Sequence, residues 1–294
     1  MTHDDLTSTR EHRAIRTIGV VGSGIMGAGL AEVAARAEFD VVLRSRTAQG
    51  AEDAHRAILA SLDRLVARDR MTTDDRAAIV ERIEVTDHLG RLADCDLVIE
   101  SVVEHLPTKR ALFAELEQIV RPDGILATNT STLPVVELAV ATQRPDRVCG
   151  IHFFNPAPSM RLVEIVRPIT ASDETIAAAV AFATSCGKET VTVEDRAGFV
   201  VNALLFPYLN NAVRMWEHGT ASMDDIDTAM CGGCNFPMGP FALLDLVGLD
   251  TSLAILDALY DEFRDPNFAA APALRRMVAA GQLGRKTKHG FRTY

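Results

Sequence analysis

The chain has few aromatic residues, few cysteines and no excess of positive charge. Aromatic side chains make up 5% of its 294 residues, and 40 acidic residues outnumber 30 lysines and arginines. The resulting net charge of −10 argues against nucleic acid or an acidic membrane surface as the partner of the whole chain. No apolar run approaches the ~18 residues of a membrane span, so we expect no membrane insertion.

The five cysteines are an odd number scattered along a long chain, which is typical of a protein kept in a reducing cytoplasm. The polar residues 1–16 also lack the apolar core of a secretory signal. Cys231 and Cys234 form one close pair, but a zinc site needs two further ligands, and no second pair offers them. We therefore expect cytoplasmic localisation, no metal site, and small buried thiols at a helix end.

A glycine-rich segment follows the first apolar run of the chain and directly precedes a helical pattern. Strand, glycine turn and helix are in the order that a βαβ unit needs to hold a dinucleotide pyrophosphate. Gly22 allows a sharp turn, Gly24 lets the backbone approach the phosphates, and Gly27 lets the helix pack close to the sheet. Ile25 and Met26 lie between the last two glycines, and we expect both at the cofactor as well.

The end of the second apolar run indicates which dinucleotide binds. An acid that bonds the ribose 2′-hydroxyl of NAD(H) is expected there, about 20 residues beyond the glycines. This chain has Ser45 at that position, between Arg44 and Arg46. A hydroxyl and a guanidinium suit a 2′-phosphate, so we expect NADP(H) to be favoured over NAD(H). The alternative is that both arginines are solvated surface charges.

Strand and helix patterns alternate through the first two thirds of the chain, which predicts a parallel sheet with helices on both faces. The later pattern is wholly helical, so we place a domain boundary near Asp195. The expected fold is α/β: a Rossmann-type doubly wound sheet in residues 1–195, followed by an all-α C-terminal domain in residues 196–294. The expected strands are Thr17–Val21, Asp40–Leu43, Ile83–Val85, Asp96–Glu100, Gly124–Ala127, Arg147–His152, Arg161–Val166 and Glu189–Val193. The expected helices include Thr47–Arg70, Thr108–Val120, Ser172–Ser185, Gly198–Gly219, Ser222–Gly232, Pro240–Leu259 and Ala271–Ala280.

A histidine at the end of one strand and a glutamate in the next form a candidate acid/base pair. Glu164 follows His152 by twelve residues, and the loop between them contains a proline. Two neighbouring strands can place these side chains together. A carboxylate on one imidazole nitrogen sets the tautomer and makes the other nitrogen a better base.

At this point the sequence closely resembles the L-3-hydroxyacyl-CoA dehydrogenase family, and in particular its 3-hydroxybutyryl-CoA dehydrogenase branch. The resemblance extends from Thr17 to Tyr294. The matching segments are Gly22–Gly27, Val98–Glu104, Thr128–Ser131, His152–Pro156, Gly198–Asn202, Pro237–Pro240 and Asp245–Asp250. The main departure is Ser45, where the NAD-linked pattern has an acid, and a smaller one is the C-terminal segment Phe291–Tyr294.

The resemblance implies a catalytic role for four residues. His152 looks like the base that removes the proton of the 3-hydroxyl group while hydride leaves C3, and Glu164 looks like its electrostatic partner. Ser131 and Asn202 look like hydrogen-bond donors to the substrate oxygens, which develop negative charge. For Ser131 the alternative is a helix N-cap ahead of Pro134. For Asn202 it is a buried amide that links two helices.

The resemblance also implies binding roles for four further residues. Glu104 and Lys109 match positions on the cofactor side, and Lys109 resembles a residue that contacts the nicotinamide ribose or the CoA moiety. Ser61 and Arg68 fall on the long predicted helix where the family grips the CoA phosphates and adenine. The alternatives are a surface lysine on a helix for Lys109, and a solvated helix face for the basic residues of the long helix.

Taken together, the sequence predicts an oxidoreductase. It would transfer hydride between NADP(H) or NAD(H) and C3 of a short-chain (S)-3-hydroxyacyl-CoA/3-ketoacyl-CoA pair, most simply 3-hydroxybutyryl-CoA and acetoacetyl-CoA. The resemblance implies a homodimer formed through the C-terminal domain. Two alternatives stay open: the same chemistry on a carrier-protein-bound or free 3-hydroxy acid, and a non-catalytic NADP(H)-binding sensor or structural protein.

Overall fold

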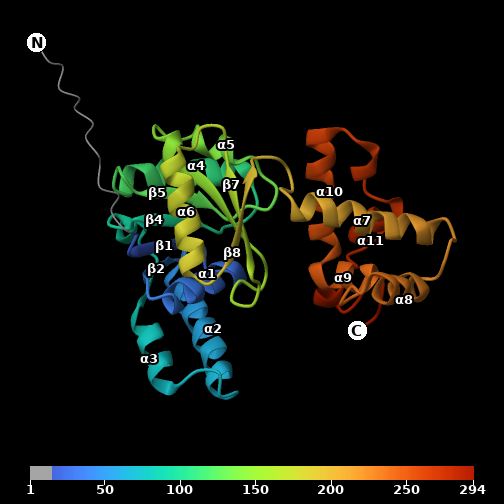
Figure 1. Ribbon diagram of the computed structural model, residues 1–294, viewed down its shortest axis with the longest axis horizontal. Helices are drawn as coiled ribbons and strands as arrows, with labels where there is room; N and C mark the ends of the chain where they lie inside the picture. Colours follow the sequence, from blue (N-terminus) through green and yellow to red (C-terminus); the bar gives the residue numbers. More distant parts are fainter. Residues whose placement is uncertain (1–14) are drawn as a thin grey trace, which may run out of the picture. The chain divides into compact units, whose positions relative to one another are not determined.

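The computed structural model describes residues 15–294. Nearly all of the polar N-terminal segment considered above therefore lies outside the described residues. The chain divides into two compact units (Figure 1). The first unit includes the chain up to Asn129, Leu138–Ile165 and Thr170–Val191, and the second includes Thr130–Glu137, Val166–Ile169 and Thr192–Tyr294.

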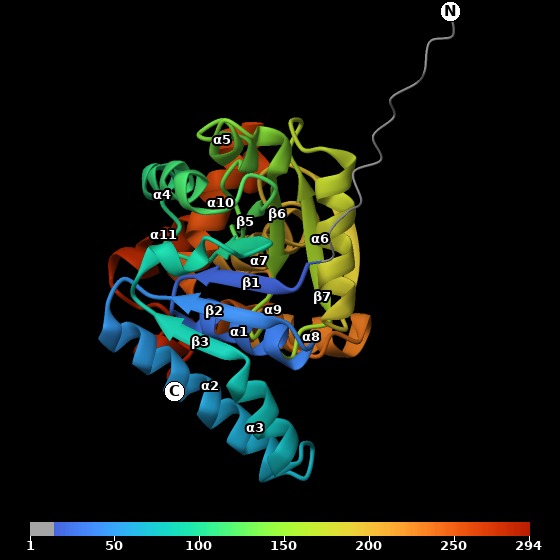
Figure 2. The same cartoon turned by 90° about the vertical axis from the view of Figure 1, so that its left-hand side faces the viewer.

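One sheet of eight strands forms the centre of the first unit, and all eight expected strands are present. Their spatial order is β3-β2-β1-β4-β5-β6-β7-β8. The ladders from β3 to β6 are parallel, and Figure 2 shows β1, β2 and β3 side by side. The α/β fold with a helical second part is confirmed. The strands are β1 Thr17–Val21, β2 Asp40–Arg44, β3 Ile83–Thr86, β4 Leu97–Glu100, β5 Ile125–Thr128, β6 Val148–Phe153, β7 Leu162–Arg167 and β8 Glu189–Glu194.

Helices cover this sheet, and their apolar faces build a continuous core with the strands. The long helix predicted for Thr47–Arg70 is shorter than expected. It ends at Val66 because Asp69 adopts a left-handed conformation, with a φ of 53°, and a separate helix follows. Arg68 therefore lies in a turn. The helices here are α1 Ile25–Arg36, α2 Ala48–Val66, α3 Thr73–Glu81, α4 Leu106–Ile119, α5 Val135–Ala139 and α6 Asp173–Ser185; α5 lies mostly in the second unit.

The second unit is helical and has a core of its own. The single helix predicted for Pro240–Leu259 is wrong, since two helices replace it. Gly248 separates them with a φ of 103°, a conformation that other residues rarely adopt. The helices are α7 Val201–Glu217, α8 Met223–Cys234, α9 Pro240–Val247, α10 Leu249–Phe263 and α11 Pro272–Ala279.

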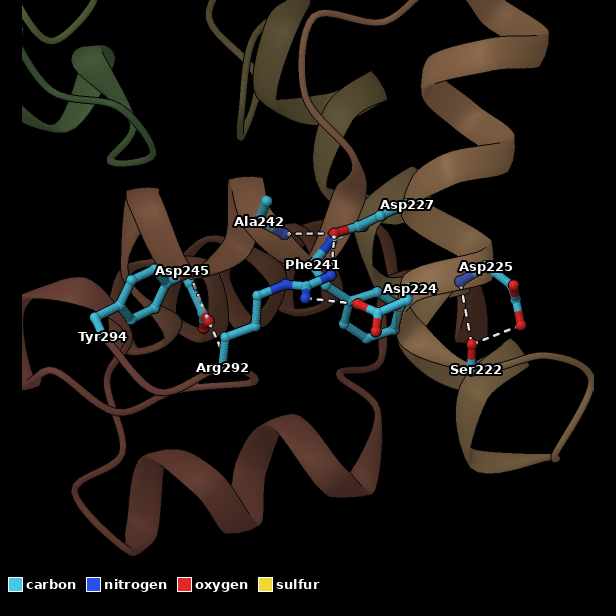
Figure 3. Close-up of polar contacts among 9 residues, drawn as sticks. All are labelled: Ser222, Asp224, Asp225, Asp227, Phe241, Ala242, Asp245, Arg292 and Tyr294. Carbon is cyan, nitrogen blue, oxygen red and sulfur yellow. Dashed lines mark hydrogen bonds and ion pairs between the residues drawn. The ribbon is translucent and has the colours of Figure 1, made fainter.

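The C-terminal residues are bound back onto this helical unit by a buried carboxylate. Asp245 of α9 is 1% exposed and accepts hydrogen bonds from the backbone N–H groups of Phe291 and Arg292, both at 2.8 Å. The hydroxyl of Tyr294 donates to it at 3.1 Å. The guanidinium of Arg292 contacts a second acid, Asp227, at 2.9 Å (Figure 3). These bonds make the C-terminal segment part of the fold of this unit.

The cysteines are all free thiols, but the close pair is not buried as expected. Cys231 is half-buried and Cys234 is exposed, because α8 ends at Cys234. By contrast, burial raises the pKa of the Cys95, Cys149 and Cys186 thiols to about 12.

These raised values predict a loss of stability at alkaline pH. Each thiol holds its proton in the folded state above the pH at which it ionises in the unfolded chain, near 9. Stability is therefore intact below pH 9 and falls as the pH rises towards 12, by at most about 1.4 kcal/mol per pH unit for each thiol. Urea unfolding at pH 8, 9, 10 and 11 measures this decline. The variant Cys149→Ala should show a shallower decline, and an identical slope in both proteins would contradict the assignment.

Candidate active site

Two of the three glycines in the turn after β1 have no room for a side chain, and the third lies in open space. Gly22 has a φ of 121°, and a Cβ there would overlap the carbonyl oxygen of Ser101. A Cβ on Gly27 would overlap the carbonyl oxygen of Gly22, whereas a Cβ on Gly24 would meet no atom within 4 Å. The turn is thus closed towards the sheet and open at the N-terminus of α1. This arrangement fits a dinucleotide pyrophosphate, which needs bare backbone N–H groups at a helix N-terminus.

The helix residues of this segment also lie where a cofactor could reach them. Ile25 is 78% exposed although it is a large apolar residue, and Met26 is half-buried. The strand order reverses between β1 and β4, so the loops after these two strands flank the point where ligands bind in sheets of this kind.

The end of β2 is joined to the glycine turn by two hydroxyls. Ser45 is 5% exposed, and its Oγ lies 2.8 Å from Oγ of Ser23. Gly50 packs so closely against this hydroxyl that a Cβ would overlap it. Arg46 is exposed, whereas Nε of Arg44 is buried and has no hydrogen-bond partner in the described part of the chain. At this position the structure therefore has hydroxyls and guanidinium groups in place of the expected acid.

The candidate acid/base pair is assembled in the first unit. His152 in β6 is 3% exposed, and its Nδ1 lies 2.7 Å from Oε2 of the fully buried Glu164 in β7. A carboxylate beside Nδ1 can accept a hydrogen bond from that nitrogen, and the basic lone pair of the imidazole is then on Nε2. The ring of Phe154 packs on the imidazole with centroids 4.5 Å apart. The pair can therefore take up and return one proton at a defined atom.

Two residues that the sequence analysis missed hold the loop that follows His152. Asn129 accepts a hydrogen bond from the backbone N–H of Phe153 at 2.8 Å. Lys188 donates from Nζ to the carbonyl oxygens of Ala157 and Met160, at 2.7 and 2.8 Å. Burial lowers the pKa of this lysine. Asn129 lies in the matching segment Thr128–Ser131, whereas nothing in the sequence distinguishes Lys188 from a surface lysine.

A buried ion pair lies at the carboxyl end of β4. Lys109 of α4 is fully buried, so the surface-lysine alternative is wrong. Its Nζ lies 2.8 and 2.9 Å from the two carboxylate oxygens of Glu100 and 3.1 Å from Oε2 of Glu104. Glu100 also accepts hydrogen bonds from Oγ1 of Thr128 at 2.8 Å and from the N–H of Val102 at 2.6 Å. The sequence analysis gave Glu100 no role, although an acid that ends an apolar strand was a usable signal.

Ser131 and Asn202 both belong to the second unit. The first N–H groups of α5, those of Val135 and Val136, donate to the carboxylate of Asp195 at 2.9 and 2.7 Å. Asp195 therefore caps the N-terminus of this helix. Burial raises the pKa of the Asp195 carboxyl.

Asn202 lies in the first turn of α7 and is 7% exposed. Within residues 15–294 its amide makes no hydrogen bond to a neighbouring helix, so the helix-linking alternative finds no support. The two expected CoA-binding residues lie in the first unit. Ser61 is half-buried in α2, and Arg68 is exposed in the turn after that helix.

Two family models together match residues 17–294 almost without a gap. The model described as 3-hydroxyacyl-CoA dehydrogenase, NAD binding domain, matches residues 17–196, and the model described as 3-hydroxyacyl-CoA dehydrogenase, C-terminal domain, matches residues 198–294. The chain belongs to the 3-hydroxyacyl-CoA dehydrogenase family. The resemblance inferred from the motifs is thus confirmed, and the protein is an oxidoreductase with a nicotinamide cofactor.

Individual members of this family are similar over nearly the whole chain. A 3-hydroxybutyryl-CoA dehydrogenase of Mycobacterium tuberculosis is 46% identical over 283 residues, which are 96% of this chain and 99% of the relative. One of Clostridioides difficile is 45% identical over 278 residues, 94% of this chain and 99% of the relative. The crystal structure of (S)-3-hydroxybutyryl-CoA dehydrogenase PaaH1 from Ralstonia eutropha superposes with a TM-score of 0.93 at 41% identity, covering 96% of this chain and 99% of that one.

Within residues 15–294 of the protein we find neither a membrane-spanning helix nor a candidate metal-binding cluster. None of its helices has both the length and the hydropathy required to cross a membrane. Residues 15–294 also contain no group of three or more histidine, cysteine, aspartate or glutamate side chains that could hold a metal ion.

Proposed function

We propose that the protein transfers hydride between a nicotinamide cofactor and C3 of a short-chain (S)-3-hydroxyacyl-CoA/3-ketoacyl-CoA pair, most simply 3-hydroxybutyryl-CoA and acetoacetyl-CoA. The buried contact of 2.7 Å between His152 and Glu164 carries this proposal, since it places a carboxylate partner at Nδ1 of the imidazole. Family membership and the names of the similar proteins support the substrate class.

In the proposed reaction, His152 moves the proton that accompanies hydride transfer. A nicotinamide cofactor bound at the glycine turn would supply or accept the hydride. In the oxidative direction, Nε2 of His152 accepts the proton of the substrate 3-hydroxyl group as C3 loses hydride. The imidazolium that forms is stabilised by the Glu164 carboxylate, and in the reductive direction it returns the proton to the oxygen on C3.

Four other residues are proposed to hold the substrate. Ser131 and Asn202 donate hydrogen bonds to the substrate oxygens, and preplaced donors of this kind stabilise negative charge as it develops. Ser61 and Arg68 contact the CoA phosphates and adenine. The exposure of Arg68 in a turn supports this role, because a free guanidinium can bind phosphate bidentately.

We further propose that NADP(H) is favoured over NAD(H). Ser45 and Arg46 support this, because no carboxylate stands at the end of β2 to repel a 2′-phosphate, and Arg46 is exposed. The glycine turn, with Glu104 and Lys109 on the nicotinamide side, is proposed to bind either dinucleotide.

Acetoacetyl-CoA reduction by the purified protein tests both proposals, with kcat/KM compared for NADPH and NADH. We expect turnover with a higher kcat/KM for NADPH. The variant Ser45→Asp should move the ratio towards NADH by about tenfold or more, since tenfold corresponds to ~1.4 kcal/mol and like charges repel. An NADH preference in the unmodified protein would overturn the 2′-phosphate argument and leave the chemistry intact.

The alternatives predict other outcomes of the same assay. Turnover of a carrier-protein-bound or free 3-hydroxy acid, with none of the CoA thioester, would favour those substrates. No turnover with any of them would favour a non-catalytic NADP(H)-binding protein. The buried His152–Glu164 pair supports the catalytic proposal, because it can exchange a proton.

We also propose a homodimer formed through the helical C-terminal unit, in a reducing cytoplasm. Leu204, Met215 and Leu246 are large apolar residues of that unit and are 72%, 46% and 50% exposed. Exposed apolar side chains of this kind are available to pack against a second copy of the chain. The free cysteines support a reducing compartment. Sedimentation equilibrium distinguishes dimer from monomer.

A further inference from the structure

The two residues that are proposed to donate to the substrate oxygens belong to the same unit, although they are far apart in the sequence. Ser131 lies in the segment Thr130–Glu137, and Asn202 lies in the first turn of α7. Two donors act together only when their spacing matches the substrate oxygens, because a misplacement of about 1 Å can cost roughly 10²-fold in rate. The helical unit therefore has to fix these two segments of chain to one another.

The segment that contains Ser131 is held at both of its ends. At the start, Oγ1 of Thr130 accepts hydrogen bonds from the backbone N–H groups of Leu133 and Thr132, at 2.9 and 3.3 Å. At the other end, the first two N–H groups of α5 donate to the two carboxylate oxygens of Asp195, at 2.9 and 2.7 Å. The backbone on both sides of Ser131 is thus tied to a side-chain oxygen.

Asp195 also begins the stretch of chain that leads to Asn202. In this stretch the N–H of Ala197 donates to the carboxylate of Glu262 in α10 at 2.8 Å. Gly198 follows with a φ of 73°, and a Cβ on it would come within 2.8 Å of a leucine side chain of the same helix. The stretch is therefore fixed on α10 directly before α7 begins.

One carboxylate thus joins the two segments. Asp195 belongs to the stretch that leads to Asn202, and its two oxygens hold the helix that follows Ser131. We propose that Asp195 is a positioning residue that sets the spacing of the two substrate donors. This inference rests on the proposed function and deepens it.

A double-mutant cycle tests this role, because a residue that acts through Ser131 has little further effect once that hydroxyl is gone. Ser131→Ala should lower kcat/KM for acetoacetyl-CoA by about 10²-fold, which is typical for the loss of one preplaced donor. Asp195→Asn keeps the size of the side chain and one acceptor oxygen, and should lower kcat/KM about tenfold by shifting the segment. The double variant should lie within about threefold of Ser131→Ala alone.

A second carboxylate of the same unit offers a matched control. Asp227 accepts hydrogen bonds from the N–H groups of Phe241 and Ala242 in the first turn of α9, at 2.8 and 3.2 Å (Figure 3). Asp227→Asn therefore weakens the same kind of helix cap without changing the contacts of Asp195. It should lower the Tm at least as much as Asp195→Asn, since it also removes the charge beside Arg292. Its kcat/KM should stay within about twofold of the original, as expected for an independent site.

Titration with the preferred dinucleotide separates a local effect from a loss of folding. The Kd should change less than about twofold in each variant, because the glycine turn belongs to the other unit. Additive effects of Ser131→Ala and Asp195→Asn, an unaffected kcat/KM in Ser131→Ala, or an equal loss in Asp227→Asn would each overturn the positioning role and leave the hydride transfer in place. If the unmodified protein reduces no acetoacetyl-CoA with either cofactor, the proposed function fails and this inference fails with it.

Discussion

Replacing His152 by glutamine is expected to lower kcat for acetoacetyl-CoA reduction by about 10³-fold, because general acid–base catalysis by a positioned side chain contributes roughly 10²–10⁴-fold. Glutamine can still occupy the buried position beside Glu164, but it cannot exchange a proton at neutral pH. Steady-state kinetics with saturating cofactor measure the effect. KM for the thioester should change far less than kcat, since the proton transfer belongs to the transition state.

The partner variant Glu164→Gln examines the tautomer argument. A neutral amide can donate to Nδ1 as well as accept from it, so it no longer forces the proton onto that nitrogen. We expect kcat to fall by about 10²-fold, and the double variant to be hardly worse than His152→Gln alone, since the two residues act as a unit. Retention of a tenth of the original kcat by His152→Gln would remove His152 from the mechanism.

Much of the first unit could be predicted because it depends on local patterns. Apolar β-rich runs specify the eight strands, and the glycine spacing specifies the turn, since Gly22 and Gly27 occupy places where a Cβ would overlap backbone. His152 and Glu164 are close in sequence, and one short loop separates their strands. In such features, residues that are close in space are also close in sequence.

Other features of the structure depend on contacts that no local pattern encodes. Lys109 has the sequence surroundings of a surface lysine, and only the fold shows that it is buried between acids. Lys188 contacts a loop about 30 residues away. Gly248 lies within a helical pattern in the sequence, and only the structure shows its positive φ. A sequence pattern can extend a predicted helix across such a glycine, but it does not give the backbone angle of the glycine.

Replacing Asp245 by alanine is expected to destabilise the helical unit by about 3–5 kcal/mol, because a buried N–H group that loses its acceptor costs roughly 1–3 kcal/mol. Two N–H groups are affected, those of Phe291 and Arg292, and the Tyr294 hydroxyl loses its partner as well (Figure 3). Thermal unfolding should show a Tm lower by about 10 °C or more, since 1 kcal/mol shifts the Tm of a domain of ~100 residues by roughly 4–8 °C.

Two matched variants show whether the cost arises from the backbone bonds. Tyr294→Phe removes only a 3.1 Å bond from a side chain that is 46% exposed, so it should cost less than about 1 kcal/mol. Arg292→Met removes the ion pairs with Asp224 and Asp227 but keeps the backbone N–H that donates to Asp245, and partly exposed ion pairs are worth about 1 kcal/mol or less. If Arg292→Met lowered the Tm as much as Asp245→Ala, the ion pairs would hold the C-terminal segment in place, and the buried carboxylate would be secondary. Asp245→Ala should cost the most of the three, because it alone leaves backbone N–H groups without an acceptor.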